Sequence, residues 1–331
     1  MNLHEDRDVW LEVVHITADH FAIPAVYVEK DYWVTWVLRN LSRSAFRERL
    51  IFKGGTALSK AHQLIHRFSE DIDLAAHVTG MSGNQVKQFI RDAEATLAEG
   101  LSYIPNHPAE SKHGLFRKTW HNYPRLITGD FVQASPQLLL EINAFTTPEP
   151  FSPRPIKSLI AEALIQLGQG AATERYGLGE FSVNVLNIER TIAEKIMGLV
   201  RASREKLPDV ALKARIRHIY DLCLIKRHAE FAPLFRDNAL LEMLSIVETA
   251  DREQFSFAGN WLDEPISETM IFAHPEQVWS QLDIEFRSRF AVMVYNNDLP
   301  ANEEILLMLK AVHQQLTFFD IARGQNAGKL P

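Results

Sequence analysis

The stretch that most constrains this chain is a pair of glycines, Gly54-Gly55, which lies between a short apolar run and a second one that carries two aspartates. Glycine permits backbone angles that a Cβ would forbid, and it lets a ligand come close to the main chain. Apolar residues then recur with a helical period at positions 57, 58, 61, 64 and 65. We therefore expect a strand, a glycine turn and a helix whose first N–H groups face outward, where they can bind phosphate.

The two aspartates follow on the next predicted strand, as Asp71-Ile72-Asp73. Residues two apart on a strand share a face, so both carboxylates point one way while Ile72 points into the core. Their Cα atoms should lie about 6.6 Å apart, a spacing at which two carboxylates can share one divalent cation or bridge two. Taken alone, the glycine pair is explained by an ordinary turn, and the Asp-x-Asp by a solvated loop. The two features together indicate phosphoryl or nucleotidyl transfer.

A third carboxylate, Glu141, interrupts the apolar run from Leu138 to Phe145. A carboxylate is seldom buried in such a strand without a partner. Glu141 is therefore either an exposed residue of a half-solvated strand or a third metal-facing carboxylate beside Asp71 and Asp73. We favour the second explanation.

These residues resemble a known family, the AbiEii/AbiGii-type nucleotidyltransferases of the DNA polymerase β-like superfamily. The resemblance covers about residues 25 to 225, and its segments occur in the family's order: Glu29-Lys30-Asp31-Tyr32-Trp33, Lys53-Gly54-Gly55-Thr56-Ala57-Leu58, Arg67-x-Ser69-x-Asp71-Ile72-Asp73-Leu74, Glu189 to Lys195, and Arg217 to Leu222. Members of this family are toxins of bacterial abortive-infection and toxin–antitoxin systems. The resemblance thus implies an enzyme that transfers a nucleoside monophosphate from an NTP, with a role in phage defence.

The resemblance also implies a fold class and a division of the chain. We expect an α+β protein with a polymerase β-like core, in which helices flank a small mixed sheet, followed by a mostly helical C-terminal region. Residues 146 to 155 contain four prolines and read as an irregular connector. We therefore expect a nucleotidyltransferase core with N-terminal helices at 1–150, and at 151–331 a helical domain that contributes Lys195 and Asp221 to the cleft.

The family's pattern assigns roles to these positions. Asp71, Asp73 and Glu141 would hold Mg²⁺, with Mn²⁺ as the alternative. The nucleotide-binding set is predicted to hold the triphosphate: Lys53, Gly54, Gly55, Thr56, Arg67, Ser69 and Lys195.

Four of these positions have a second explanation. Lys53 and Arg67 flank the glycine turn and either contact phosphate or are simply solvated. Lys195 would neutralise charge on the triphosphate, although most helix lysines are only exposed side chains. Asp221 is expected to act as a base or to orient another group, or else to pair with Arg217 one helical turn away.

The partners implied by the resemblance are an NTP, an RNA acceptor such as a tRNA 3′ end, and a cognate antitoxin; a protein acceptor is the alternative to RNA. The formal net charge of −7 argues against a broadly basic surface but not against a local basic groove. Basic residues gather between 201 and 227 and between 112 and 125. The first stretch could contact RNA or be a solvated helix face, and the second is best explained as a solvated hairpin.

The composition favours the cytoplasm. Cys223 is the only cysteine, the N-terminus is polar, and no apolar run reaches the ~18 residues of a membrane span. Two competing functions stay open at this point. One is another metal-dependent phosphoryl enzyme, a nuclease or phosphohydrolase; the other is a non-catalytic nucleotide- or RNA-binding module.

Overall fold

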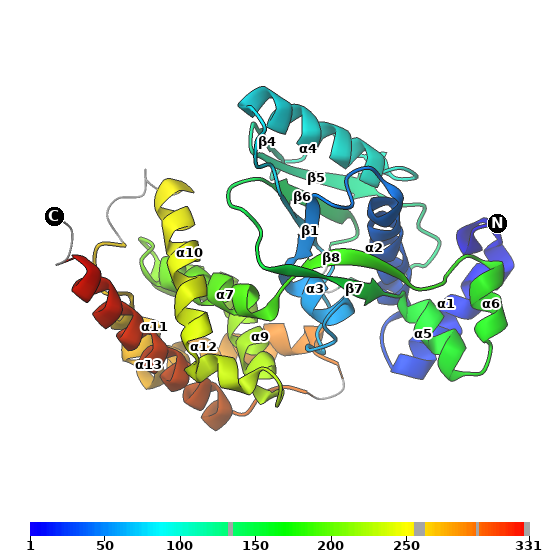
Figure 1. The fold of residues 1–331 in the computed structure, drawn as a ribbon. Helices are drawn as coiled ribbons and strands as arrows, with labels where there is room; N and C mark the ends of the chain where they lie inside the picture. The colour runs from blue at the N-terminus through cyan, green and yellow to red at the C-terminus, as the bar shows by residue number, and fades with distance from the viewer. Residues whose placement is uncertain (132–134, 255–261, 296–297, 328–331) are drawn as a thin grey trace. The chain divides into compact units, whose positions relative to one another are not determined.

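The computed structural model describes residues 1–131, 135–254, 262–295 and 298–327, and the chain divides into two compact units (Figure 1). Unit 1 comprises Met1–Gln63 and Arg67–Leu186, and unit 2 comprises Leu64–His66 and the chain from Asn187 onward. The sequence predicted a division after residue 150. The units divide later, after Leu186, because the two strands that follow residue 150 pair with the sheet of unit 1.

Unit 1 combines a mixed sheet with helices, as the predicted α+β class requires. Its helices are α1 (Arg7–Phe21), α2 (Ala25–Arg43), α3 (Gly54–Lys60), α4 (Gly83–Leu97), α5 (Leu159–Gln166) and α6 (Gly170–Arg175), after a 3₁₀ turn, η1 (Leu3–Glu5). Its strands are β1 (Leu50–Lys53), β2 (Ile72–Ala76), β3 (Ser102–Tyr103), β4 (Ser111–His113), β5 (Phe116–Asn122), β6 (Leu138–Asn143), β7 (Phe151–Ile156) and β8 (Phe181–Leu186). The strand order is β3-β5-β6-β2-β1-β8-β7, and β4 pairs with β5.

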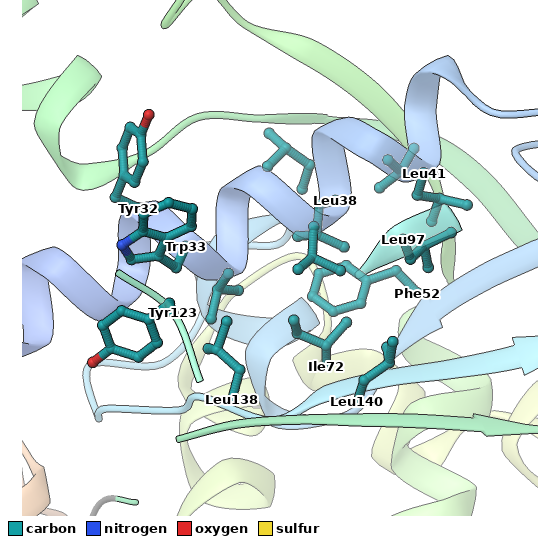
Figure 2. Close-up of a cluster of buried hydrophobic side chains, with 14 of the residues drawn as sticks. Tyr32, Trp33, Leu38, Leu41, Phe52, Ile72, Leu97, Tyr123, Leu138 and Leu140 are labelled. Atoms are coloured by element: carbon teal, nitrogen blue, oxygen red, sulfur yellow. The ribbon is translucent and has the colours of Figure 1, made fainter. Parts of the chain in front are cut away.

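The alternation of side chains along the central strands separates the two faces of the sheet. Leu50 and Phe52 of β1, Ile72 and Leu74 of β2, and the even-numbered residues of β6 belong to one buried apolar cluster with α2 and α4. Figure 2 shows side chains of α2 above the aliphatic and aromatic residues of these strands. With period 2, the odd-numbered residues must point to the opposite face, and these include the predicted site residues of β1, β2 and β6.

The proline-rich segment is partly a strand. β7 pairs antiparallel with β8 and is the last strand in the sheet order, and it contains Pro153 and Pro155. Proline cannot donate a backbone hydrogen bond, so within sheets it is confined to edge strands and bulges. An edge position therefore lets a segment that reads as an irregular connector pair with β8.

The regular elements of unit 2, within the residues that the structure describes, are helices joined by turns and coil. Its elements are α7 (Ile188–Ser203), α8 (Pro208–Ala214), α9 (Ile216–Arg227), η2 (Ala232–Arg236), α10 (Asn238–Gln254), η4 (Ile266–Glu268), α11 (Met270–Ala273), α12 (Pro275–Glu285), the π-helical turn η5 (Phe286–Phe290), η6 (Ala291–Met293) and α13 (Asn302–Ala327). The predicted helical C-terminal region is thus confirmed. Over the described part of the chain, none of the helices has the length and hydrophobicity needed to cross a bilayer.

Candidate active site

A row of four charged residues crosses the middle of the sheet. Lys53 of β1 is the register partner of Asp73 on β2, Asp73 is the partner of Glu141 on β6, and Glu141 is the partner of Lys118 on β5. Directly paired residues of neighbouring strands point to the same face and come within side-chain contact. The Lys118 Nζ lies 3.8 Å from a Glu141 carboxylate oxygen. The row therefore places two carboxylates side by side between two lysines.

Asp71 directly precedes β2, which begins at the fully buried Ile72. Within the residues described here, no three His, Cys, Asp or Glu side chains converge into a ready metal site. The donor chemistry of the paired Asp73 and Glu141 still fits a hard divalent cation, because Mg²⁺ takes carboxylate oxygens and needs only one or two of them when phosphate supplies further ligands. β6, the strand of Glu141, lies next to β2 in the sheet.

The glycine turn packs directly against this acidic row. Gly54 has φ +81°, and a Cβ added to it would lie 2.3 Å from a carboxylate oxygen of Asp73. A Cβ on Gly55 would lie 2.4 Å from the Arg67 Nη2 and 2.8 Å from the Ser69 hydroxyl. A side chain at Gly54 would therefore have to displace Asp73 and keep a positive φ, and one at Gly55 would have to displace Arg67 and Ser69. The turn, the Arg67–Ser69 segment and Asp73 therefore form one closely packed unit.

The helix after the glycines is shorter than its apolar period predicts. α3 ends at Lys60, before Leu64 and Ile65, and Gln63 in the following turn takes a left-handed φ of +54°. A helix of seven residues has a weak dipole. Any phosphate binding here must therefore rely on the turn's own N–H groups and on neighbouring side chains.

Three of those side chains surround the turn. The hydroxyls of Thr56 and Ser69 lie 3.0 Å apart, and Thr56 is fully buried. Arg67 is also buried, with 3% of its surface exposed, and its Nη1 donates to the Phe68 carbonyl. The prediction that Arg67 could be merely solvated is therefore wrong, because its guanidinium packs against the turn.

Lys195 and Asp221 lie in unit 2 and bind each other. The Lys195 Nζ on α7 donates to a carboxylate oxygen of Asp221 on α9 at 2.7 Å, and both side chains are buried. The alternative of an exposed helix lysine is thus excluded. The partner expected for a structural Asp221 is Arg217; the structure gives it Lys195. The neighbouring His218 ring is buried next to the Lys195 carbonyl, and burial, followed by the Lys195 charge, lowers its pKa.

The charged run at Glu29 to Asp31 has a structural role that sequence reasoning missed. Charged side chains are usually exposed, but Glu29 and Lys30 are fully buried. Glu29 accepts hydrogen bonds from the backbone N–H groups of residues 126 and 127, and burial raises its pKa against that effect. Asp31 accepts from the Lys60 Nζ at 2.5 Å and from the Leu159 N–H at 2.8 Å.

Lys30, the middle member of the run, pairs with Glu70, the residue before Asp71. Neither its burial nor this partner 40 residues away was foreseen. One signal was available in the sequence: three consecutive charges interrupt an otherwise apolar helix that also carries Tyr32 and Trp33. Charged residues within a buried helical stripe are rare unless they are paired.

Comparisons with known proteins support the assignment of a family. No curated protein matches the chain. Seven solved chains match it, among them MenT4, a nucleotidyltransferase toxin from Mycobacterium tuberculosis H37Rv, with 18% identity over 92% of this chain and 97% of the other and a TM-score of 0.49. Residues 36–306 match the family model described as nucleotidyl transferase AbiEii toxin, type IV TA system. Because this match spans most of the chain and includes both the glycine turn and the helix of Lys195, the protein belongs to the AbiEii family of nucleotidyltransferase toxins.

Proposed function

We propose that this nucleotidyltransferase moves a nucleoside monophosphate from an NTP to a hydroxyl of RNA, with a tRNA 3′ end as the expected acceptor. It would act in the cytoplasm and be neutralised by a cognate antitoxin, as toxin–antitoxin membership suggests. One observation carries the chemical part of the proposal. Asp73 and Glu141 are direct cross-strand partners, and Asp73 packs against the Gly54 turn so closely that a Cβ there would collide with it.

Asp71, Asp73 and Glu141 are the residues that would hold the divalent cation, Mg²⁺ or Mn²⁺. When bound, such cations neutralise the charge that develops on the attacking and leaving oxygens during phosphoryl transfer. The protein's own contribution is to keep Asp73 and Glu141 side by side on one face of adjacent strands, with Asp71 directly before β2.

The triphosphate would be held by the glycine turn and its surroundings. The N–H groups of Gly54 and Gly55, the hydroxyls of Thr56 and Ser69, and the cations of Lys53 and Arg67 are the groups assigned to it. Lys195 is assigned to the same reaction as a point charge for the triphosphate, with Asp221 holding its ammonium in place.

The reaction balances without a further reactant. The acceptor hydroxyl oxygen forms a bond to the α-phosphorus, the bond from that phosphorus to the bridging oxygen breaks, and pyrophosphate leaves with the electron pair. The hydroxyl proton passes to a carboxylate of the site. Positioning and charge neutralisation, rather than covalent chemistry by the protein, supply most of the rate in transfers of this kind.

The basic stretch at residues 201 to 227 contains both engaged and exposed cations. Several cations of the basic stretch are engaged within the protein: Arg201 binds Asp251 at 2.5 Å, and Arg204 donates to the Pro265 carbonyl at 2.7 Å. Lys206 and Lys213 are exposed around α8 and are the better candidates for phosphate contacts. RNA is proposed because the family resemblance implies it and these exposed lysines are compatible with it.

The test supplies each of the four α-³²P-labelled NTPs separately, with Mg²⁺, total RNA and a protein extract. Label that enters RNA of unchanged or slightly increased length supports the proposal, and degradation of the tRNA fraction beforehand should abolish it. Label that enters protein would show that the acceptor is a protein and not RNA. RNA that shortens without incorporation indicates a nuclease, and no change of RNA, protein or NTP indicates a binding module.

A further inference from the structure

We propose that Lys30 is a positioning residue for the acidic site: by binding Glu70 and the Ser135 carbonyl, it holds together the segments that lead into β2 and β6. Lys30 lies on α2 with a fully buried side chain. Its Nζ donates to Glu70 at 2.5 Å and also to the carbonyl of Ser135. This inference rests on the proposed function, because it concerns the carboxylates assigned to that reaction.

Hydrogen bonds connect Lys30, Glu70 and Ser135 in a ring. Lys30 donates to one carboxylate oxygen of Glu70, and the other oxygen accepts the Ser135 N–H at 2.7 Å. Glu70 is the residue before Asp71, and Ser135 precedes β6, the strand of Glu141. The Lys30 ammonium and the Glu70 carboxylate therefore connect the segment before β2, which contains Asp71, to the segment before β6, the strand of Glu141.

A second pair of contacts reinforces this attachment from the same helix. Tyr27, one turn before Lys30 on α2, stacks on Phe68 with ring centroids 3.9 Å apart. Its hydroxyl donates to the Phe131 carbonyl at 3.1 Å. Helix α2 thus contacts the segment before β2 through a stacked aromatic pair and an ion pair, and the chain before β6 through hydrogen bonds to two carbonyls.

A buried ion pair is an inefficient way to gain stability. Burial lowers the pKa of Lys30 and raises that of Glu70, while their mutual attraction opposes both shifts. Apolar or neutral replacements of such pairs are often as stable as the pair itself, whereas the charged hydrogen bonds define one geometry. The Lys30–Glu70 pair therefore contributes mainly by fixing where the residues next to it lie, and Asp71 is adjacent to Glu70.

The inference predicts a loss of activity that does not follow stability. Lys30→Met should unfold more easily, because Glu70 remains buried without its cation. The double variant Lys30→Met/Glu70→Gln removes both charges and keeps an acceptor for the Ser135 N–H, so its melting temperature should return toward that of the wild type. We expect its kcat to stay about 10- to 100-fold low, with a smaller change in KM for the NTP, because supporting residues around metal ligands have effects of this size.

A readout independent of activity is amide hydrogen exchange. In the double variant, residues 67–76 and 135–143 should exchange faster than in the wild type. Asp31→Asn is the matched control for hydrogen exchange: Asp31 is the neighbour of Lys30 on α2, and it pairs at the same 2.5 Å with Lys60 of α3, outside the segments before β2 and β6. It should leave exchange in both segments near the wild-type values.

The outcomes separate this inference from the proposed function. If the double variant regains stability, kcat and slow exchange together, Lys30 is only structural and the inference is wrong. If the wild type transfers no nucleotide, the proposed function fails, and the exchange experiment still decides whether Lys30 holds the two segments. The inference is supported if the double variant is stable but shows faster exchange and a low kcat, while Asp31→Asn shows wild-type exchange.

Discussion

Asp73 on β2 and Glu141 on β6 are direct partners across parallel strands, although 68 positions separate them in the sequence. Parallel neighbours in register hold their side chains at a fixed spacing on one face. Lys53 and Lys118 flank the two carboxylates in the same row. Their positive charges offset the repulsion between Asp73 and Glu141. A divalent cation would perform the same neutralisation more strongly.

The first prediction concerns these two carboxylates. Asp73→Asn or Glu141→Gln should lower the transfer rate by about 1,000-fold, because metal-type charge stabilisation is worth several kcal/mol and about 1.4 kcal/mol corresponds to a factor of ten. The melting temperature should change little, since the substitution removes a repulsion between two carboxylates and also an attraction to the neighbouring lysine. Incorporation of labelled NTP and a thermal melt measure the two effects.

Glu110→Gln is a suitable control for this pair. Glu110 binds Lys112 at 2.8 Å and lies outside the row, in the loop before β4. Its loss should leave incorporation at the wild-type level. An Asp73→Asn variant that transferred nucleotide as fast as this control would show that the row has no catalytic role.

The second prediction concerns the glycine turn. Gly54→Ala places a methyl group 2.3 Å from the Asp73 carboxylate and forces a non-glycine residue to keep a φ of +81°. The left-handed conformation alone costs about 1–2 kcal/mol, and relief of the contact must displace Asp73. We expect both a lower melting temperature and a loss of transfer comparable to that of Asp73→Asn.

Gly83→Ala controls for glycine replacement as such. Gly83 is the first residue of α4, and a Cβ there meets nothing within 4 Å. Since alanine favours helix, its melting temperature should be unchanged or slightly higher. Equal activities for Gly54→Ala and Gly83→Ala would contradict the role assigned to the turn.

The segment from β1 through α3 to β2 was predictable because its sequence signals are local. A short apolar run, two glycines and an alternating Asp-x-Asp strand each specify a conformation within a few residues, and β1, α3 and β2 follow that order. Glu141 stood out for a similar reason, as one charge within an apolar strand. Its register opposite Asp73 is known only from the structure, since pairing between distant strands leaves no local trace.

The parts that sequence reasoning missed depend on distant partners. The sequence does not indicate that Lys30 pairs with Glu70, or that Asp221 pairs with Lys195 instead of Arg217. Pro153 and Pro155 argue against a strand unless that strand lies at the edge of the sheet. In each case the residue's own preference is weak, and the tertiary neighbour decides.

The third prediction separates structure from chemistry at the buried pair of unit 2. Asp221→Asn or Lys195→Met leaves one buried charge without its opposite, which should destabilise the protein by about 3–5 kcal/mol. The double variant Lys195→Met/Asp221→Leu should recover most of that stability and still fail to transfer nucleotide. Thermal melts and the incorporation assay on the same preparations measure both effects.

Lys310→Met is the matched control for a broken ion pair in unit 2. Lys310 binds Glu276 at 2.6 Å, but more than half of each side chain is exposed. An exposed pair contributes only about 0–1 kcal/mol, so this variant should melt close to the wild type and remain active. If Asp221→Asn melted like Lys310→Met, the buried pair would have no structural role.

The last prediction is a pH dependence of stability from His62. Its Nε2 donates to the Leu186 carbonyl at 3.1 Å, and burial lowers its pKa to about 4 in the folded protein. The unfolded chain takes up a proton near the ordinary value of about 6.5, so the unfolded state binds more protons between these values. The stability from neutral His62 is therefore fully present above about pH 6.5 and is lost as the pH falls toward 4, by up to about 3 kcal/mol.

Melting temperatures of the wild type and His62→Gln should converge as the pH falls through this window, whereas His113→Gln, at an exposed position of β4, should keep the wild-type slope. Parallel melting curves for the wild type and His62→Gln would show that His62 does not set this dependence.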